Sequence, residues 1–161
     1  MQKKTFKHFY YDGLGFSIHL INVPMIKTRG EWTPDINYNQ LQKSVLLALV
    51  TKSTSLTGNE ICFIRKYFCR TLQSFGQEFG VTHVAVMDWE KEGNKAVKMN
   101  PATEKCIRLF ILDELKVADR KFRKSYHDVK INQLAEHQKS KKKIALVPLV
   151  FDLQDSFLAC G

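Results

Sequence analysis

Residues 71–93 read TLQSFGQEFGVTHVAVMDWEKEG, and this stretch decides the fold. Thr71 and Thr82 each stand where a side-chain oxygen can cap the first turn of a short helix. Gly80 lies between the two helical segments, where a left-handed residue ends one helix and redirects the chain. Gly93 closes the second segment. The stretch therefore predicts two short helices joined by a tight turn, which is the outline of a helix-turn-helix.

The residues inside this motif indicate how its two helices pack. Gly76 has no β-carbon, so the helices can approach closely there. Trp89 is expected in the core rather than at a contact surface, because a large aromatic side chain contributes mainly buried area. Glu90 is expected to pair with a cation or to end the helix. The anchoring side chains we expect are Phe75, Phe79, Val81, Val84 or Ala85, Val86 and Trp89.

Helical periodicity continues on both sides of the motif. The segment from Asn37 to about Thr51 has one apolar face, formed by Leu41, Val45, Ala48 and Leu49. The sequence Thr57-Gly-Asn-Glu60 is a capping-box signature, and the helix after it carries Ile61, Ile64 and Phe68. Asn100-Pro101 starts a longer helix whose apolar face is Ile107, Phe110, Ile111 and Leu115.

The two ends of the chain have a different character. Residues 16–23 alternate as a strand does, within a segment rich in glycine and proline, which predicts a small β-rich arm. One basic helix is expected after Lys116, with Phe122, Tyr126, Val129 and Leu134 along one stripe. Residues 144–151 are expected to form an edge strand, because Pro148 cannot donate to a ladder, with residues 156–160 as its return strand. This hairpin is expected to pair with the arm.

The expected fold class is therefore mainly α with small β. A five-helix domain over residues 37–115 is flanked by a β-rich arm, residues 1–36. A basic helical extension with a short β segment follows, residues 116–161. A chain of 161 residues accommodates this as one domain with appendages.

Charge is distributed unevenly along the chain, whose net charge is +9. Residues 56–115 hold eight Lys or Arg and eight acidic residues, so the central helices carry no net charge. Residues 116–143 hold ten Lys or Arg and three acidic residues, and Lys139–Lys143 is a charge run. A basic chain favours an acidic partner such as nucleic acid, but the helix-turn-helix region does not provide that charge.

Other classes of protein find little support in the sequence. The longest apolar run, Val45–Val50, is too short to cross a bilayer, and the N-terminus lacks the apolar core of a signal peptide, which favours a cytoplasmic protein without membrane contact. Cys62 and Cys106 are expected as buried apolar residues and Cys69 as partly exposed; neither the cysteines nor the five histidines show metal-ligand spacing. No phosphate loop, nucleophile elbow or H-E-x-x-H motif is present, so we expect neither an enzyme nor a cofactor.

Several motifs resemble those of the lambda-repressor-like (Xre) helix-turn-helix family. They are Leu56-Thr-Gly-Asn-Glu-Ile-Cys-Phe-Ile-Arg-Lys-Tyr, Gly80-Val-Thr, Asp88-Trp-Glu-Lys-Glu-Gly and Asn100-Pro-Ala-Thr-Glu-Lys-Cys-Ile-Arg-Leu. The similarity covers residues 56–112 and is closest to the branch of MqsA-type antitoxins and related transcriptional regulators. It implies a five-helix domain that binds double-stranded DNA as a homodimer and represses a promoter, and a toxin protein as a second partner.

Three departures from the family pattern bear on this expectation. Leu72 stands where the family usually has a glutamine that contacts DNA. Met87-Asp88 stands where an arginine is frequent, and a carboxylate there faces phosphates with the wrong charge. The zinc-binding cysteine pairs near the N-terminus of many MqsA-type proteins are absent, so no metal is implied.

Candidate contacts with DNA remain at the ends and on the outer face of the second helix. Thr82 and Gln73 lie near helix N-termini, which attract phosphate. Val84 or Met87 can touch a thymine methyl group, whereas His83 can donate to guanine or phosphate. The full set is Gln73, Thr82, His83, Val84, Met87 and Lys91. For each residue a solvated surface position is the competing interpretation.

Two functions therefore stay open. The first is a DNA-binding transcriptional regulator, and the second is a protein-interaction module that keeps the helix-turn-helix fold without reading DNA. RNA binding has little support, because no strand carries the aromatic pattern of an RNA-binding sheet.

Overall fold

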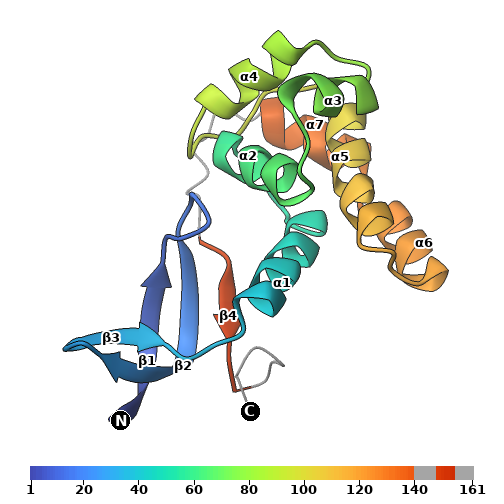
Figure 1. Cartoon of the computed structure of the whole chain (residues 1–161). Coiled ribbons are helices and arrows are strands. Elements are labelled where there is room, and N and C mark those ends of the chain that lie inside the picture. Colours follow the sequence, from blue (N-terminus) through green and yellow to red (C-terminus); the bar gives the residue numbers. More distant parts are fainter. Residues whose placement is uncertain (140–147, 155–161) are drawn as a thin grey trace. The chain divides into compact units, whose positions relative to one another are not determined.

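The computed structural model describes residues 1–139 and 148–154 (Figure 1). These residues form seven helices and a four-stranded sheet, a mixed α/β fold in which the sheet is larger than the small arm expected from the sequence. The chain divides into two compact units. The sheet unit contains residues 1–45 and 148–154, and the helical unit contains residues 46–139.

The sheet unit is built on one long central strand. β2 pairs antiparallel with β1 along most of its length, and antiparallel with β3 near its end. Arg29 and Gly30, with φ of 52° and 88°, form the two-residue turn between β2 and β3, a conformation that hairpin turns favour. The strands are β1 (Lys3–Tyr11), β2 (Ile18–Thr28) and β3 (Glu31–Pro34).

The buried face of β2 changes halfway along the strand. Ile18 and Leu20 are buried in its first half, and Val23 and Met25 in its second half. The shift by one residue occurs at Asn22, whose φ of 55° interrupts the regular pleat. The expected strand over residues 16–23 is therefore the first half of a longer strand, and simple alternation ends at Asn22.

The fourth strand comes from the far end of the chain. β4 (Val150–Asp152) pairs parallel with β2, with Leu20 opposite Phe151. The backbone N–H of His19 donates to the carbonyl of Leu149, and that of Leu153 donates to the carbonyl of Ile21. The C-terminal β segment thus joins the N-terminal sheet as a single described strand, and residues 144–147 and 156–160 of the expected hairpin lie outside the described residues.

Helix α1 (Tyr38–Val50) runs from one unit into the other without a break. Leu41 and Val45 are buried in the sheet unit, while Leu46 and Leu49 are buried in the helical unit. The predicted apolar face was correct for Leu41, Val45 and Leu49, whereas Ala48 is half-buried.

Four further helices of the helical unit begin at the expected capping residues. Thr57 accepts a hydrogen bond from the backbone N–H of Glu60, whose carboxylate accepts from the N–H of Thr57, as the capping-box pattern predicts. Asn100 caps the long helix before Pro101. Their bounds are α2 (Gly58–Tyr67), α3 (Leu72–Glu78), α4 (His83–Lys91) and α5 (Pro101–Glu114).

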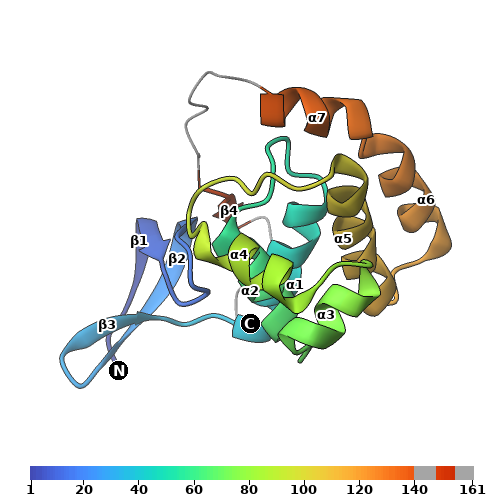
Figure 2. The ribbon, with the colours of Figure 1, turned by 90° about the horizontal axis from the view of Figure 1, so that it is seen from above.

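The basic extension holds two helices where one was expected. α6 (Asp119–Asp128) and α7 (Ile131–Lys139) are separated at Val129, whose backbone is extended. Both helices contact α5 (Figure 2). Of the expected stripe, Val129 and Leu134 are buried, but Tyr126 is exposed.

Candidate nucleic-acid interface

The α3–α4 pair is fixed at both helix starts by side-chain caps. The Thr71 Oγ1 accepts from the Ser74 N–H at 3.0 Å, and the Ser74 Oγ accepts from the Thr71 N–H at 2.9 Å. The Thr82 Oγ1 accepts from the Ala85 N–H at 3.2 Å. These bonds satisfy donors that the first turn of a helix leaves free, so both helices have defined ends.

The turn between the helices depends on two glycines. Gly80 has a φ of 68°, the left-handed conformation expected from the sequence. A β-carbon on Gly76 would lie 2.6 Å from the carbonyl oxygen of Val81, so a side chain there would force the turn to move. The Val81 N–H donates back to the Gly76 carbonyl at 2.8 Å. The chain therefore returns closely past Gly76 before α4 begins.

Aromatic packing holds α3 against the rest of the helical unit. Phe75 is fully buried, and its ring meets those of Phe79 and Phe110 edge-on. Val86 is the buried residue of α4. Trp89 and Val81 were both expected in the core, but each is only half-buried. The cause at Trp89 is an open cavity beside it, lined also by Ala85 and by residues 96–98.

An ion pair ties α4 to α2. The Arg65 Nη2 donates to the Glu90 Oε2 at 3.0 Å, and the Arg65 Nε donates to the other carboxylate oxygen. The Glu90 carboxylate holds the pKa of the Arg65 guanidinium above its ordinary value, mainly through this hydrogen bond. Glu90 thus takes the ion-pair position predicted from the sequence, and it fixes the C-terminal half of α4.

The structure places the predicted contact residues on the surface of α3 and α4. Gln73, Thr82, His83 and Lys91 are exposed, and Met87 is half-buried. Val84 is 45% exposed, which places it among the exposed large apolar side chains rather than among the anchors. Val84, Met87 and Lys91 follow each other at spacings of three and four residues, so they share the outer face of α4.

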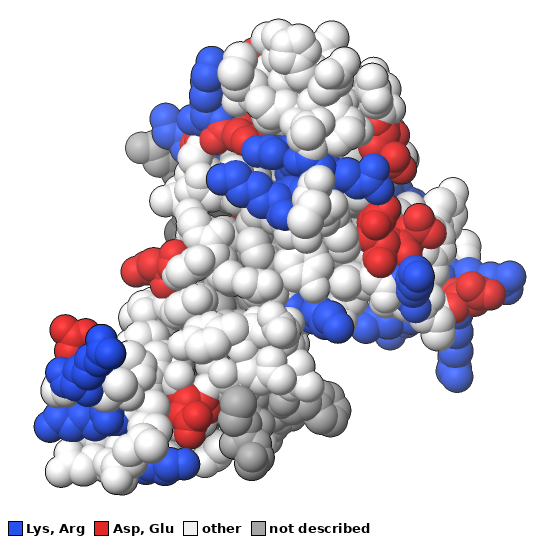
Figure 3. Space-filling model, in the orientation of Figure 1, with Lys and Arg blue, Asp and Glu red and all other residues white. Residues whose placement is uncertain are grey.

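Charge on this outer face is balanced. The Asp88 Oδ1 lies 3.6 Å from the Lys91 Nζ, and both side chains are more than half exposed, at 63% and 67%. The space-filling view shows few charged side chains over α3 and α4 on the face that it presents (Figure 3). An exposed pair of this kind contributes little to stability, but it cancels the cation that would otherwise meet a phosphate.

A stronger positive surface lies on α6. Arg120, Lys121, Arg123 and Lys124 are all exposed. Within residues 1–139 and 148–154, none of these four cations forms an ion pair. We call these four side chains the α6 cations. Their charge is available to an anionic partner, as expected for the basic extension.

A buried polar cluster organises the connector from Thr51 to Thr57. The Arg108 side chain is 1% exposed, and its guanidinium donates to the carbonyls of Lys52 at 2.6 Å and Thr54 at 2.8 Å. It also donates to the Glu104 carboxylate at 3.0 Å, which in turn accepts from the N–H of Leu56. Because connector carbonyls are costly to bury without a donor, Arg108 is a structural residue of this unit.

Sequence reasoning missed this cluster. Glu104 and Arg108 stand four residues apart on α5, the spacing at which opposite charges face each other along a helix. That spacing was a usable signal for the ion pair. It gave no sign that the pair is buried, since burial arises from the connector that wraps over α5.

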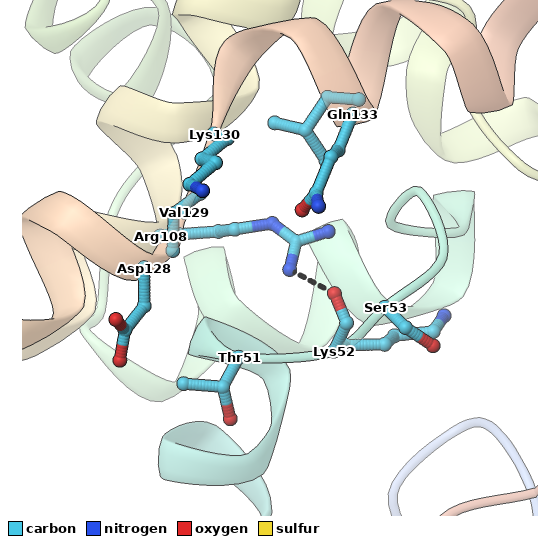
Figure 4. Close-up of a pocket in the computed structure, with 9 residues that line it drawn as sticks. Thr51, Lys52, Ser53, Arg108, Asp128, Val129, Lys130 and Gln133 are labelled. Atoms are coloured by element: carbon cyan, nitrogen blue, oxygen red, sulfur yellow. Dashed lines mark hydrogen bonds between the residues drawn. The ribbon is translucent and has the colours of Figure 1, made fainter.

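A cavity of about 210 Å³ lies beside Arg108 (Figure 4). The connector residues Thr51–Ser53 line one side, and residues 128–130 with Gln133 and Leu134 line the other. Charges around it are matched, since Lys52 pairs with Glu60 at 2.8 Å and the lining contains both Asp128 and Lys130. The cavity therefore has no net charge that would select a class of ligand.

The cysteines depart from the sequence expectation. Cys106 is exposed on α5, and Cys62 is half-buried, so the prediction of two buried cysteines was wrong. Cys106 is followed by Ile107, which takes the core position on that turn of the helix. Cys69 is exposed and has a φ of 53°, directly after the C-terminus of α2.

Comparison with known proteins gave no relative of this chain: no family model, no curated protein and no solved structure matches it. No helix in the described part of the chain is long and apolar enough to cross a membrane. Residues 1–139 and 148–154 contain no group of three or more His, Cys, Asp or Glu placed to hold a metal ion.

Proposed function

We propose that this protein is a sequence-specific DNA-binding regulator of transcription, a repressor that acts as a homodimer. The observation that carries the proposal is the α3–α4 pair, in which two capped helices meet at a tight glycine turn. The resemblance to lambda-repressor-like regulators belongs to the same proposal, as does a role as the antitoxin of a toxin–antitoxin pair.

In this proposal α4 enters the major groove. The second helix of such a motif presents its N-terminal residues to base edges, and here these are Thr82, His83 and Val84. The His83 ring can donate to guanine or phosphate, and Val84 with Met87 can contact a thymine methyl group. Two copies would read half-sites roughly 34 Å apart, one helical turn of DNA.

Most of the affinity for phosphate would come from outside α4. Because Asp88 balances Lys91, the outer face of α4 offers no net charge to the DNA backbone. The α6 cations provide four positive charges without ion-pair partners in the described residues. This division agrees with the general pattern in which phosphate contacts position a protein and base contacts specify the sequence.

An electrophoretic mobility shift with the DNA upstream of its own gene tests the proposal. Replacing His83 and Lys91 together with Ala should reduce the preference for that DNA over unrelated duplexes, because both side chains are exposed on α4. Replacing the four α6 cations with Gln should weaken binding to every duplex alike. The slope of the logarithm of the binding constant against the logarithm of the salt concentration should also become shallower, by about 0.9 for each phosphate that the variant no longer neutralises.

Two controls decide the outcome. Gln77→Ala changes an exposed residue of α3 outside the proposed contact set, and it should bind as the unaltered protein does. Removing Lys3, Lys4 and Lys7 lowers the net charge on β1 and should have less effect than removing the α6 cations. Absence of any shift at low salt, where phosphate attraction is strongest, would contradict the proposal.

A protein-interaction module is the second proposal, and one observation favours it. The cavity beside Trp89, of about 430 Å³, is flanked by the carboxylates of Asp88 and Glu92. Among the described residues of this lining, Lys98 is the one cation, against two carboxylates. Trp89 beside this acidic excess suits a cationic side chain of a partner protein. A toxin bound here would use the helices without any DNA readout.

Charge reversal at this cavity separates the two proposals. Asp88→Lys with Glu92→Lys places cations beside α4, so a DNA-binding protein should bind DNA more tightly. The same variant should lose a protein partner held by these carboxylates. The readouts are the mobility shift and the co-purification of the product of the adjacent gene.

A further inference from the structure

Two histidines meet on the sheet although they are eleven positions apart in the sequence. His8 lies on β1 and His19 on β2, and the antiparallel register places His19 opposite Tyr10. The His8 Nδ1 and the His19 Nε2 are 3.1 Å apart. The Tyr10 ring stacks on His19 with ring centroids 4.6 Å apart, which helps to orient the imidazole.

This arrangement follows from the hairpin and not from a sequence motif. The spacing of the two histidines matches no ligand pattern, so the sequence alone gives no sign of the pair. The pairing of β1 with β2 brings them together because it makes His8 and His19 diagonal neighbours across the two strands. Both backbones belong to paired strands, so bringing the two imidazoles together requires little further ordering.

The distance between the two nitrogens suits a chelate. A borderline metal ion binds imidazole nitrogen at about 2.0–2.1 Å, so two such bonds at right or tetrahedral angles span about 2.9–3.4 Å between nitrogens. The observed separation of 3.1 Å falls within that span. Rotation of both rings about their side-chain torsions directs the two lone pairs at one ion instead of at each other.

We propose that His8 and His19 bind one divalent transition-metal ion of the Cu²⁺, Ni²⁺ and Zn²⁺ class. Imidazole favours these ions, whereas Mg²⁺ and Ca²⁺ require oxygen ligands, which this pair lacks. In the metal-free pair one ring donates its N–H to the other. On binding, that ring carries its proton on its other nitrogen, so two neutral imidazoles bind the ion without releasing a proton. Water completes the coordination.

Calorimetric titration of the full chain, made without a histidine tag, tests the site with NiCl₂ and ZnCl₂ alone. We expect one ion per chain and no heat from MgCl₂. His8→Gln or His19→Gln should each weaken metal binding at least about tenfold. Once one imidazole holds the ion, the other binds it within the same molecule, and each single variant loses this gain in affinity. The double variant, which keeps no imidazole at the site, should show no binding there. His127→Gln, at an exposed histidine of α6, is the matched control and should bind as the unaltered protein does.

A spectroscopic measurement identifies the ligands of the bound ion directly, so the test does not rest on affinity alone. The electron paramagnetic resonance of bound Cu²⁺ should show two coordinated imidazole nitrogens, and one in the His8→Gln variant. Equal loss of binding in His127→Gln, or single variants that bind like the unaltered protein, would overturn the proposal. A circular dichroism spectrum of each variant distinguishes the loss of a ligand from the unfolding of the sheet.

Discussion

At the scale of single residues, Gly76 is the position on which the α3–α4 turn depends. Gly76→Ala would place a β-carbon 2.6 Å from the Val81 carbonyl oxygen and 3.2 Å from that of Thr82, both of which are backbone atoms that cannot rotate away. We expect a loss of about 1–3 kcal/mol in the free energy of unfolding, measured by urea titration. Gln77→Ala is the neighbouring control, and equal stability of the two variants would contradict this account of the turn.

Arg108 is the second residue with a large expected effect. Arg108→Met removes the donor to the Lys52 and Thr54 carbonyls and leaves the buried Glu104 carboxylate without its cation. Breaking a buried pair in this way costs about 3–5 kcal/mol. Arg123→Met, on the exposed face of α6, should change stability by no more than about 0.5 kcal/mol.

A double variant shows how much of that loss comes from the stranded charge. Adding Glu104→Gln to Arg108→Met removes the unpaired carboxylate but keeps an oxygen that can accept from the Leu56 N–H. The double variant should therefore be more stable than Arg108→Met alone. An additive, further loss would show that the carbonyls, and not the ion pair, are the main reason for Arg108.

At the scale of elements, one side-chain hydrogen bond joins the short strand β4 to β2 in addition to the backbone ladder. The Asn22 Nδ2 donates to the Asp152 Oδ1 at 3.0 Å. This bond, together with the backbone N–H of Gln154, holds the pKa of the Asp152 carboxyl below its ordinary value. Because the folded pKa is the lower one, the stabilisation is complete above the ordinary aspartate pKa and is lost as the pH falls through the lowered one.

Asn22→Gly should return the pKa of Asp152 toward its ordinary value. Glycine keeps the positive φ of 55° without strain and removes only the amide donor. A carboxyl NMR titration measures the change, and Asn94→Gly, an exposed asparagine of the helical unit, is the control. If the Asp152 titration is the same in the Asn22→Gly and Asn94→Gly variants, the contact does not set this pKa.

Helix starts were the elements best predicted from the sequence. A cap involves residues within three positions of each other, so the local sequence is enough to predict it. Each expected capping residue does cap its helix: Thr57, Thr71, Thr82 and Asn100. The positive φ of Gly80 is local for the same reason. These signals need no knowledge of tertiary structure.

The elements that the sequence did not predict depend on distant residues. The sequence predicted that a C-terminal β segment pairs with the N-terminal arm, but not that β4 runs parallel to β2. The burial of Arg108 and the meeting of His8 with His19 were not predicted either, because each contact depends on how the chain folds. The break between α6 and α7 at Val129 has no proline or glycine to signal it. Of the candidate interface, the exposure of the outer face of α4 was predictable, but its cancelled charge depended on the Asp88–Lys91 geometry.

At the scale of the whole molecule, we expect α1 to make the two units unfold together. The helix contributes Leu41 and Val45 to one core and Leu46 and Leu49 to the other, so its unfolding removes apolar packing from both.

The two tryptophans report on the units separately, since Trp32 lies on β3 and Trp89 on α4. In urea titrations of Trp89→Phe and Trp32→Phe, the remaining fluorescence should give coincident midpoints, as a two-state protein requires. Adding Ser44→Pro, in the middle of α1, removes a helical hydrogen bond at a cost of about 3 kcal/mol and should lower both midpoints together. Separate midpoints, or a shift seen by one tryptophan only, would show that the units unfold independently.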